Sequence, residues 1–143
     1  MLTIPCTDEP DRHLSLESAR AKGKRWARVA GGRPQVGIHI DMEMDIAMQE
    51  CSGNLTTSET FAQLEAMLEE KVVGMVAEAV QLVQAQKSDV FGLGEIFYRT
   101  APGYWRQVQD GWNDEYFPSL EPVLSADVRL LRGGLTIRPI PVE

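Results

Sequence analysis

The stretch QVGIHIDMEMDIAM, residues 35–48, alternates apolar and polar side chains over fourteen positions. Apolar residues stand at the even positions from Val36 to Met48, and polar or small residues stand at the odd ones. A period of two sends one row of side chains into a core and the other row to the opposite face. One polar face is typical of an antiparallel sheet. The Gly31-Gly32-Arg33-Pro34 turn before it predicts a hairpin with a short strand over residues 24–30.

A helical pattern follows this strand. Thr56 and Glu59 form a capping box, which marks the start of a helix. Apolar residues then recur every three or four positions, so the sequence predicts one long helix that ends near residue 86. This stripe consists of Phe61, Leu64, Leu68, Val72, Met75, Ala79 and Leu82. We expect it to pack across the sheet; a partner helix in a coiled coil is the alternative.

The rest of the chain predicts shorter elements. Asp89 is placed to cap a second helix over residues 90–98, and Pro102 suits the start of a third helix that ends near Gly111. Residues 123–131 indicate a strand, with a further short strand over 135–137, whereas residues 1–23 suggest a short extended piece followed by a loop. This order predicts an α+β domain, in which a long α-helix and two shorter helices pack on one face of an antiparallel β-sheet.

Composition narrows the possible functions. A chain of 143 residues is expected to form one domain, and a net charge of −7 argues against a nucleic-acid partner. No apolar run is long enough to span a bilayer. The two cysteines, Cys6 and Cys51, can pair or stay free, and the sequence leaves both options open.

No catalytic, cofactor-binding or metal-binding site is predicted from the residues. His39 alternates onto the polar face of the strand, and no spacing of cysteine and histidine suits zinc. Asp41, Glu43 and Asp45 stand on that same face and form a row that cannot curl around a calcium ion. Such a row is either a solvated sheet face or a contact surface for a basic partner, and the three residues are our candidate partner-contact positions.

Residues 87–117 hold eight of the ten aromatic residues of the chain. The Gly92-Leu93-Gly94 step lacks the third glycine and the preceding strand of a dinucleotide-binding fingerprint. We expect the aromatic side chains to anchor two short helices on the long one. A pocket for a small ligand is the alternative for this aromatic segment, residues 91–117.

The sequence motifs of this segment resemble those of the C-terminal domain of the C subunit of bacterial spore germinant receptors, the Ger(x)C lipoproteins. That domain carries Ser-Asp-hydrophobic-Phe-Gly-hydrophobic-Gly, then Pro-x-x-Trp, a second Trp, a Phe, and a strand ending in a basic-x-Gly turn. The matching positions here are Asp89, Phe91, Gly92, Gly94, Pro102, Trp105, Trp112, Phe117 and Gly133. The match is firm over residues 71–135 and is one of pattern over 31–70. We therefore expect a Ger(x)C-like domain over residues 31–143, preceded by a partly extended segment over 1–30.

The resemblance implies a non-catalytic part of a membrane-associated receptor complex, with a role in its assembly or in signalling during nutrient-triggered germination. The implied partners are the two integral-membrane subunits, A and B, at the inner membrane of the spore. The family is attached there by an N-terminal lipid anchor, which we do not find in this sequence, so we expect this chain alone to be soluble. The resemblance implies no cofactor.

Overall fold

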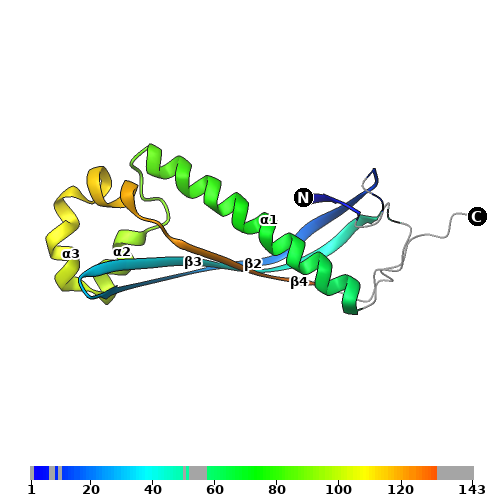
Figure 1. Cartoon of the computed structure of the whole chain (residues 1–143), viewed down its shortest axis with the longest axis horizontal. Helices are drawn as coiled ribbons and strands as arrows, with labels where there is room; N and C mark the ends of the chain where they lie inside the picture. Colours follow the sequence, from blue (N-terminus) through cyan, green and yellow to red (C-terminus); the bar gives the residue numbers. More distant parts are fainter. Residues whose placement is uncertain (1, 7–8, 10, 50, 52–57, 132–143) are drawn as a thin grey trace, which may run out of the picture. The chain divides into compact units, whose positions relative to one another are not determined.

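A computed structural model describes residues 2–6, 9, 11–49, 51 and 58–131 of the chain. The fold is α+β: a curled, mostly antiparallel sheet of four strands with one long helix and two shorter helices packed against it (Figure 1), which confirms the predicted class. The strands stand in the order β1-β2-β3-β4. They are β1 (Leu2–Pro5), β2 (His13–Ala30), β3 (Arg33–Gln49) and β4 (Val123–Leu130). The helices are α1 (Ser58–Ala85), α2 (Leu93–Thr100) and α3 (Pro102–Val108).

The β2–β3 hairpin turns on Gly31 and Gly32, whose φ angles are 59° and 76°. Positive φ at both central residues is the type I′ turn, which favours glycine and matches the twist of the flanking strands. The hairpin is longer than predicted, because β2 begins at His13 and the expected loop before Gly23 is strand. Residues 17–26 are all exposed, so this stretch lacks the buried, alternating apolar side chains by which a strand is detected.

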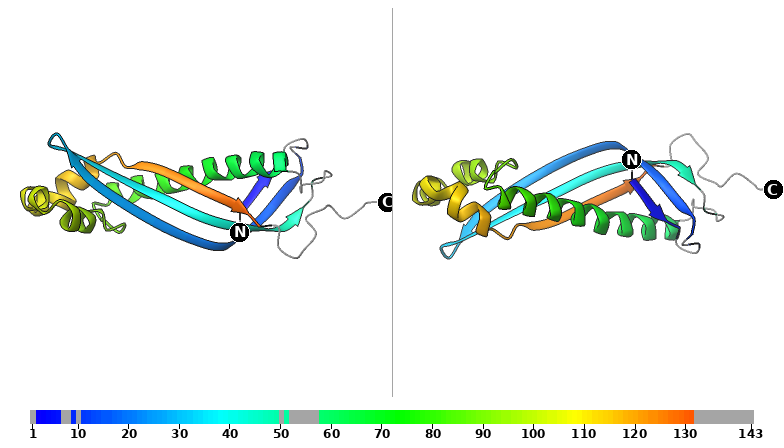
Figure 2. Two further views of the ribbon diagram at one scale, coloured as in Figure 1. Left: turned by 90° about the horizontal axis from the view of Figure 1, so that it is seen from below. Right: turned by 90° about the horizontal axis from the view of Figure 1, so that it is seen from above.

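Strand β4 runs parallel to β3, which Figure 2 shows by the direction of the two arrows. The His39 ring hydrogen-bonds to the Ser125 hydroxyl at 2.7 Å, and the Leu131 N–H donates to the Met44 carbonyl at 2.9 Å. The residue numbers of the paired positions therefore increase together along the two strands, as they do in a parallel pair. Parallel neighbours need a crossover connection, and helices α1, α2 and α3 supply it. Leu124, Ala126, Val128 and Leu130 are more buried than the residues between them, as the alternation predicted.

The predicted apolar stripe of α1 is right in its first half and wrong in its second. Phe61, Leu64, Leu68 and Val72 are buried, whereas Met75 is 53% exposed and Leu82 is 59% exposed, with Ala79 exposed between them. Beyond Val72 the inward positions are Val76, Val80 and Val83. The predicted stripe advanced by about 3.3 residues per turn there, so it drifted off the face that a period of 3.6 keeps turned inward.

The chain divides into two compact units, and strands β2, β3 and β4 and helix α1 contribute residues to both. Unit 1 comprises Met1–Lys22, Asp41–Glu70 and Asp127–Glu143, and unit 2 comprises Gly23–Ile40 and Lys71–Ala126. The buried residues of unit 1 include Ile4, Leu14, Leu16, Met44, Phe61, Leu64, Leu68, Val128 and Leu130. The core of unit 2 consists of Val36, Ile38, Val80, Leu93, Phe97, Val108, Trp112 and Phe117.

A disulfide between Cys6 and Cys51 joins the end of β1 to the chain just after β3, within unit 1. Their Cα atoms are 5.7 Å apart, and 45 positions separate them in sequence. Both residues are buried. This settles the alternative that the sequence left open. Thr56, Gly133 and the strand expected over residues 135–137 lie outside the described residues.

Candidate functional site

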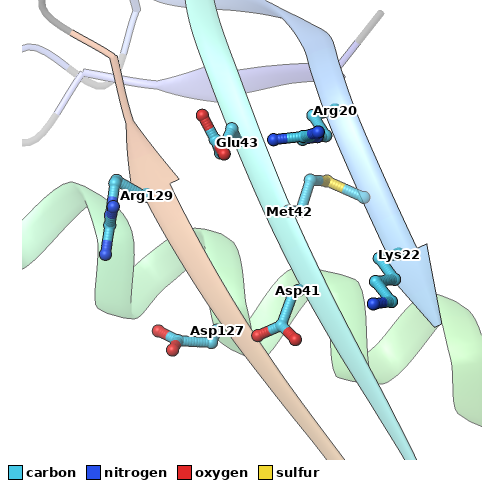
Figure 3. Close-up of a pocket in the computed structure, with 7 residues that line it drawn as sticks. All are labelled: Arg20, Lys22, Asp41, Met42, Glu43, Asp127 and Arg129. Atoms are coloured by element: carbon cyan, nitrogen blue, oxygen red, sulfur yellow. The ribbon is translucent and has the colours of Figure 1, made fainter. Parts of the chain in front are cut away.

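The acidic row of β3 borders an open recess on the sheet face of unit 1, with a volume of about 430 Å³. Figure 3 shows that three neighbouring strands build its lining. The lining residues are Arg20 and Lys22 from β2, Asp41, Met42 and Glu43 from β3, and Asp127 and Arg129 from β4. Asp41 and Glu43 are half-buried, whereas Asp45 is exposed and does not line the recess.

Charges of both signs meet in this recess. The two-residue turn places Ala30 opposite Arg33, and the same register places Lys22 opposite Asp41 and Arg20 opposite Glu43. Figure 3 shows the side chains in these two rows, with Asp127 beside Asp41 and Arg129 on the far side of Glu43. Charges alternate across the strands in the row of Glu43, whereas the like charges of Asp127 and Asp41 are neighbours in the other row. Opposite charges across a sheet stabilise the pairing by roughly 0.2–1 kcal/mol each.

The sequence analysis found Asp41 and Glu43 of this charged recess and missed Asp127 and the three basic residues. An uninterrupted acidic face was expected, because strand β2 was taken as beginning at residue 24 and β4 was not placed beside β3. The signal for two of the three cations was present: counting outward from the Gly-Gly turn pairs residues whose numbers sum to 63, which places Arg20 and Lys22 opposite the acids. The contribution of Asp127 and Arg129 depends on the parallel pairing of β4, which the sequence does not specify.

The recess is suited to binding and offers little for chemistry. Its lining has no histidine, cysteine, serine or threonine that could act as a nucleophile or base near neutral pH. Within the part of the chain that the structure describes, no three His, Cys, Asp or Glu residues are grouped so that they could hold a metal ion. Fixed charges on an exposed sheet face can still bind a partner that carries the complementary charge pattern.

The aromatic segment is organised around the carboxylate of Asp89 in unit 2. One oxygen of Asp89 accepts the Leu93 N–H at 2.9 Å, and the other accepts the Gly94 N–H at 2.8 Å and the Trp112 indole N–H at 2.9 Å. Asp89 thus accepts the first N–H groups of α2, but the helix begins at Leu93, three residues later than predicted, and Gly92 is its N-cap residue. The same carboxylate also fixes the indole that follows 23 positions on, and charge-assisted bonds of this kind are the stronger ones.

Two glycines of the segment have distinct roles. Gly92 has a φ of 69°, a conformation that side chains disfavour, and it directly precedes α2. At Gly94 an added Cβ would lie 2.8 Å from both the Trp105 and Trp112 rings. Arg25 of β2 donates to the carbonyls of Phe91 at 2.6 Å and Gly92 at 3.2 Å, which ties this turn to the hairpin. Gly92 thus permits the tight turn before α2, and Gly94 permits the close approach of the two tryptophan rings.

Aromatic rings contact one another around Trp112, which is 4% exposed. Its ring centre lies 5.2 Å from that of Trp105, 5.6 Å from Phe97 and 6.4 Å from Phe117. Phe97 also contacts Tyr104 at 5.1 Å. Trp105 is only half-buried, and Tyr98 is 61% exposed, so not every aromatic residue is an anchor. Gln84 of α1 donates to the carbonyls of Phe117 and Leu120, and Pro102 is the first residue of α3.

Comparison with known proteins agrees with this organisation. A model of the family described as "Spore germination B3/ GerAC like, C-terminal" matches residues 1–134. The chain belongs to this family. It is 26% identical over 127 residues to "Spore germination protein KC" of Bacillus subtilis (strain 168), and the match covers 89% of this chain and 31% of that protein. The chain therefore spans about a third of the length of this curated relative.

The fold of the GerAC-like domain is also found in a solved structure. The crystal structure of the GerBC protein matches 90% of this chain and 39% of its own chain, with a TM-score of 0.70 and 20% identity. The domain is thus a member of the germinant receptor C subunit family, which is involved in spore germination and whose members are generally non-catalytic receptor subunits. Among the described residues, no helix has both the length and the hydropathy to cross a bilayer.

Proposed function

We propose that this GerAC-like domain is a non-catalytic component of a membrane-associated spore germinant receptor complex, and that it acts in assembly or signalling during nutrient-triggered germination. Its partners in this proposal are the integral-membrane A and B subunits at the inner membrane of the spore. A lipid anchor on the full-length subunit would hold it there. Family membership supports the proposal, and so does a surface on the domain that suits a protein contact.

The charged recess is the observation that carries the proposal. Its carboxylates and cations come from three adjacent strands, so the sheet holds them at fixed spacings. A rigid pattern of both signs favours one complementary partner surface and disfavours others, because a misplaced like charge costs free energy. Asp41 and Glu43 are the candidate contact residues within it, and Asp45 lies on the same strand just outside it.

The alternative function, a small-ligand pocket in the aromatic segment, has less support. The rings of Phe97, Trp105, Trp112 and Phe117 contact one another, and the Trp112 N–H that could mark a ligand is taken by Asp89. The charged recess lies in the other unit, and no aromatic residue lines it. These contacts give the aromatic residues a packing role.

The test replaces Asp41→Asn, Glu43→Gln and Asp45→Asn together in the full-length subunit. We expect weaker co-purification with the membrane subunits and a slower response of spores to germinant, with the loss in co-purification largest at low salt, because salt screens the charges of the parent. A matched control replaces the exposed residues Glu78→Gln, Asp110→Asn and Glu121→Gln, which removes the same charge elsewhere. Normal assembly and response in the first variant, or an equal loss in the control, would remove the acidic row from the proposal.

A further inference from the structure

The tip of the β2–β3 hairpin carries charged side chains of one sign only. Gly23–Ile40 holds four of the 14 Lys and Arg residues of the chain and none of its 21 Asp and Glu residues. Every one of these basic side chains is exposed. They are Lys24, Arg25, Arg28 and Arg33. In a chain with a net charge of −7, such a local reversal of sign indicates an anionic partner.

An aromatic residue stands among these cations. Trp26 is 38% exposed and is among the few large apolar side chains that are exposed. Its ring lies over Gly37 of β3, where an added Cβ would collide with the indole, so the glycine sets the position of the ring. The Arg28 guanidinium lies 5.5 Å from the ring centre, and Arg28 also hydrogen-bonds to Gln35 on β3. A partly exposed tryptophan with a cation over its ring suits a boundary between water and an apolar phase.

We propose that this basic hairpin tip, residues 23–40, binds the anionic headgroup surface of a lipid bilayer. The cations are spread along a strand and around a turn, and the charged recess of about 430 Å³ lies in the other unit and contains none of them. A headgroup surface neither needs a pocket nor imposes a register, so it matches this layout better than a folded acidic protein would. Each basic residue near such a surface contributes about fivefold to binding, and the effect acts within about 10 Å at 0.1 M salt. Binding at the tip therefore depends on the charges close to it and not on the net charge of the chain.

Arg25 holds the backbone of a neighbouring turn in place. Its guanidinium donates to two carbonyls of the turn before α2, so its replacement would disturb the fold. The lipid-binding residues of the proposal are therefore Lys24, Arg28 and Arg33, with Trp26 inserted at the interface. This surface is separate from the charged recess, and either proposal can fail without the other.

Vesicle sedimentation with the purified chain tests the inference. We expect binding to vesicles of equal parts phosphatidylglycerol and phosphatidylcholine, no binding to phosphatidylcholine alone, and release at roughly 0.5 M salt. Lys24→Gln, Arg28→Gln and Arg33→Gln together should weaken binding on the order of 100-fold. The control Lys87→Gln, Arg99→Gln and Arg106→Gln removes the same charge from exposed sites of the same unit, two of which pair with acids, and should bind within a few-fold of the parent.

A second readout does not depend on those variants. Tryptophan emission should shift to shorter wavelength on anionic vesicles, and Trp26→Phe should abolish the shift, because Trp112 is buried and Trp105 is half-buried. Absence of binding to anionic vesicles, or an equal loss in the control variant, would overturn the proposal. Binding to soluble polyglutamate with none to vesicles would also overturn it, and would assign the tip to an acidic protein partner.

Discussion

The two units of the domain use their carboxylates in opposite ways. In unit 2, Asp89 accepts three N–H groups from its own segment. A partner could bind this carboxylate only by displacing those groups, which would disturb the fold. In unit 1, Asp41 and Glu43 border an open recess across from basic residues of the neighbouring strands. The most recognisable motif of the sequence is therefore a packing device. The charged recess, which carries no motif, is the better candidate for contact with other proteins.

Replacement of Trp112 should produce the largest effect and tests the packing side of this comparison. Trp112→Ala removes a buried ring that touches three other aromatic rings and leaves Asp89 without one donor. We expect a loss of about 3–5 kcal/mol in the free energy of unfolding. Trp105→Ala should cost less, because that ring is only half-buried. Urea midpoints of both variants measure the difference, and equal midpoints would show that burial does not set the order.

Removal of the disulfide tests what holds unit 1 together. The bond closes a loop of 45 positions, and crosslinks of native proteins contribute about 2–4 kcal/mol. Cys6→Ala with Cys51→Ala should lower the melting temperature and speed amide exchange in β1, whose pairing is limited to residues 13–16 of β2. The parent chain with added reductant is the matched sample. A melting temperature that responds to neither treatment would mean that β1 pairing alone suffices.

The Asp89 carboxylate provides an intermediate effect. Asp89→Asn keeps the size of the side chain and removes its charge, and hydrogen bonds to a charged group contribute about 1.5–3 kcal/mol. We expect a loss within that range and greater access of quencher to Trp112. Asp110→Asn, an exposed change in the same unit, serves as the comparison. If Asp89→Asn unfolds at the same urea concentration as Asp110→Asn, the carboxylate is not the organising group of the aromatic segment.

The sequence predicted unit 2 in more detail than unit 1, and the reason is physical. Asp89, Pro102 and the Gly-Gly turn act through their immediate neighbours, so helix starts and the hairpin could be located from local chemistry. The pairing of β4 with β3 joins residues about 86 positions apart, as His39 and Ser125 show, and no local pattern specifies it. Arg20 and Lys22 stand on a strand exposed along its middle, where apolar alternation is lost. The charged recess depends on both of these features, so the sequence analysis predicted only Asp41 and Glu43 of its lining.

The smallest effect tests whether the charged recess contributes to folding at all. Arg20 and Glu43 stand opposite each other by the hairpin register and line the same recess. Exposed pairs of this kind contribute roughly 0.2–1 kcal/mol, because solvent screens them and both side chains lose freedom. A double-mutant cycle with Arg20→Gln and Glu43→Gln, read from urea midpoints, should give a coupling energy in that range that shrinks as salt rises. Lys22→Gln with Glu43→Gln, which combines residues of two different rows, should give a smaller value.

A coupling well above 1 kcal/mol would mean that the pair of Arg20 and Glu43 stabilises the fold, and the case for the recess as a partner surface would weaken. A coupling near zero would leave both charges available to a partner, at little cost to the fold.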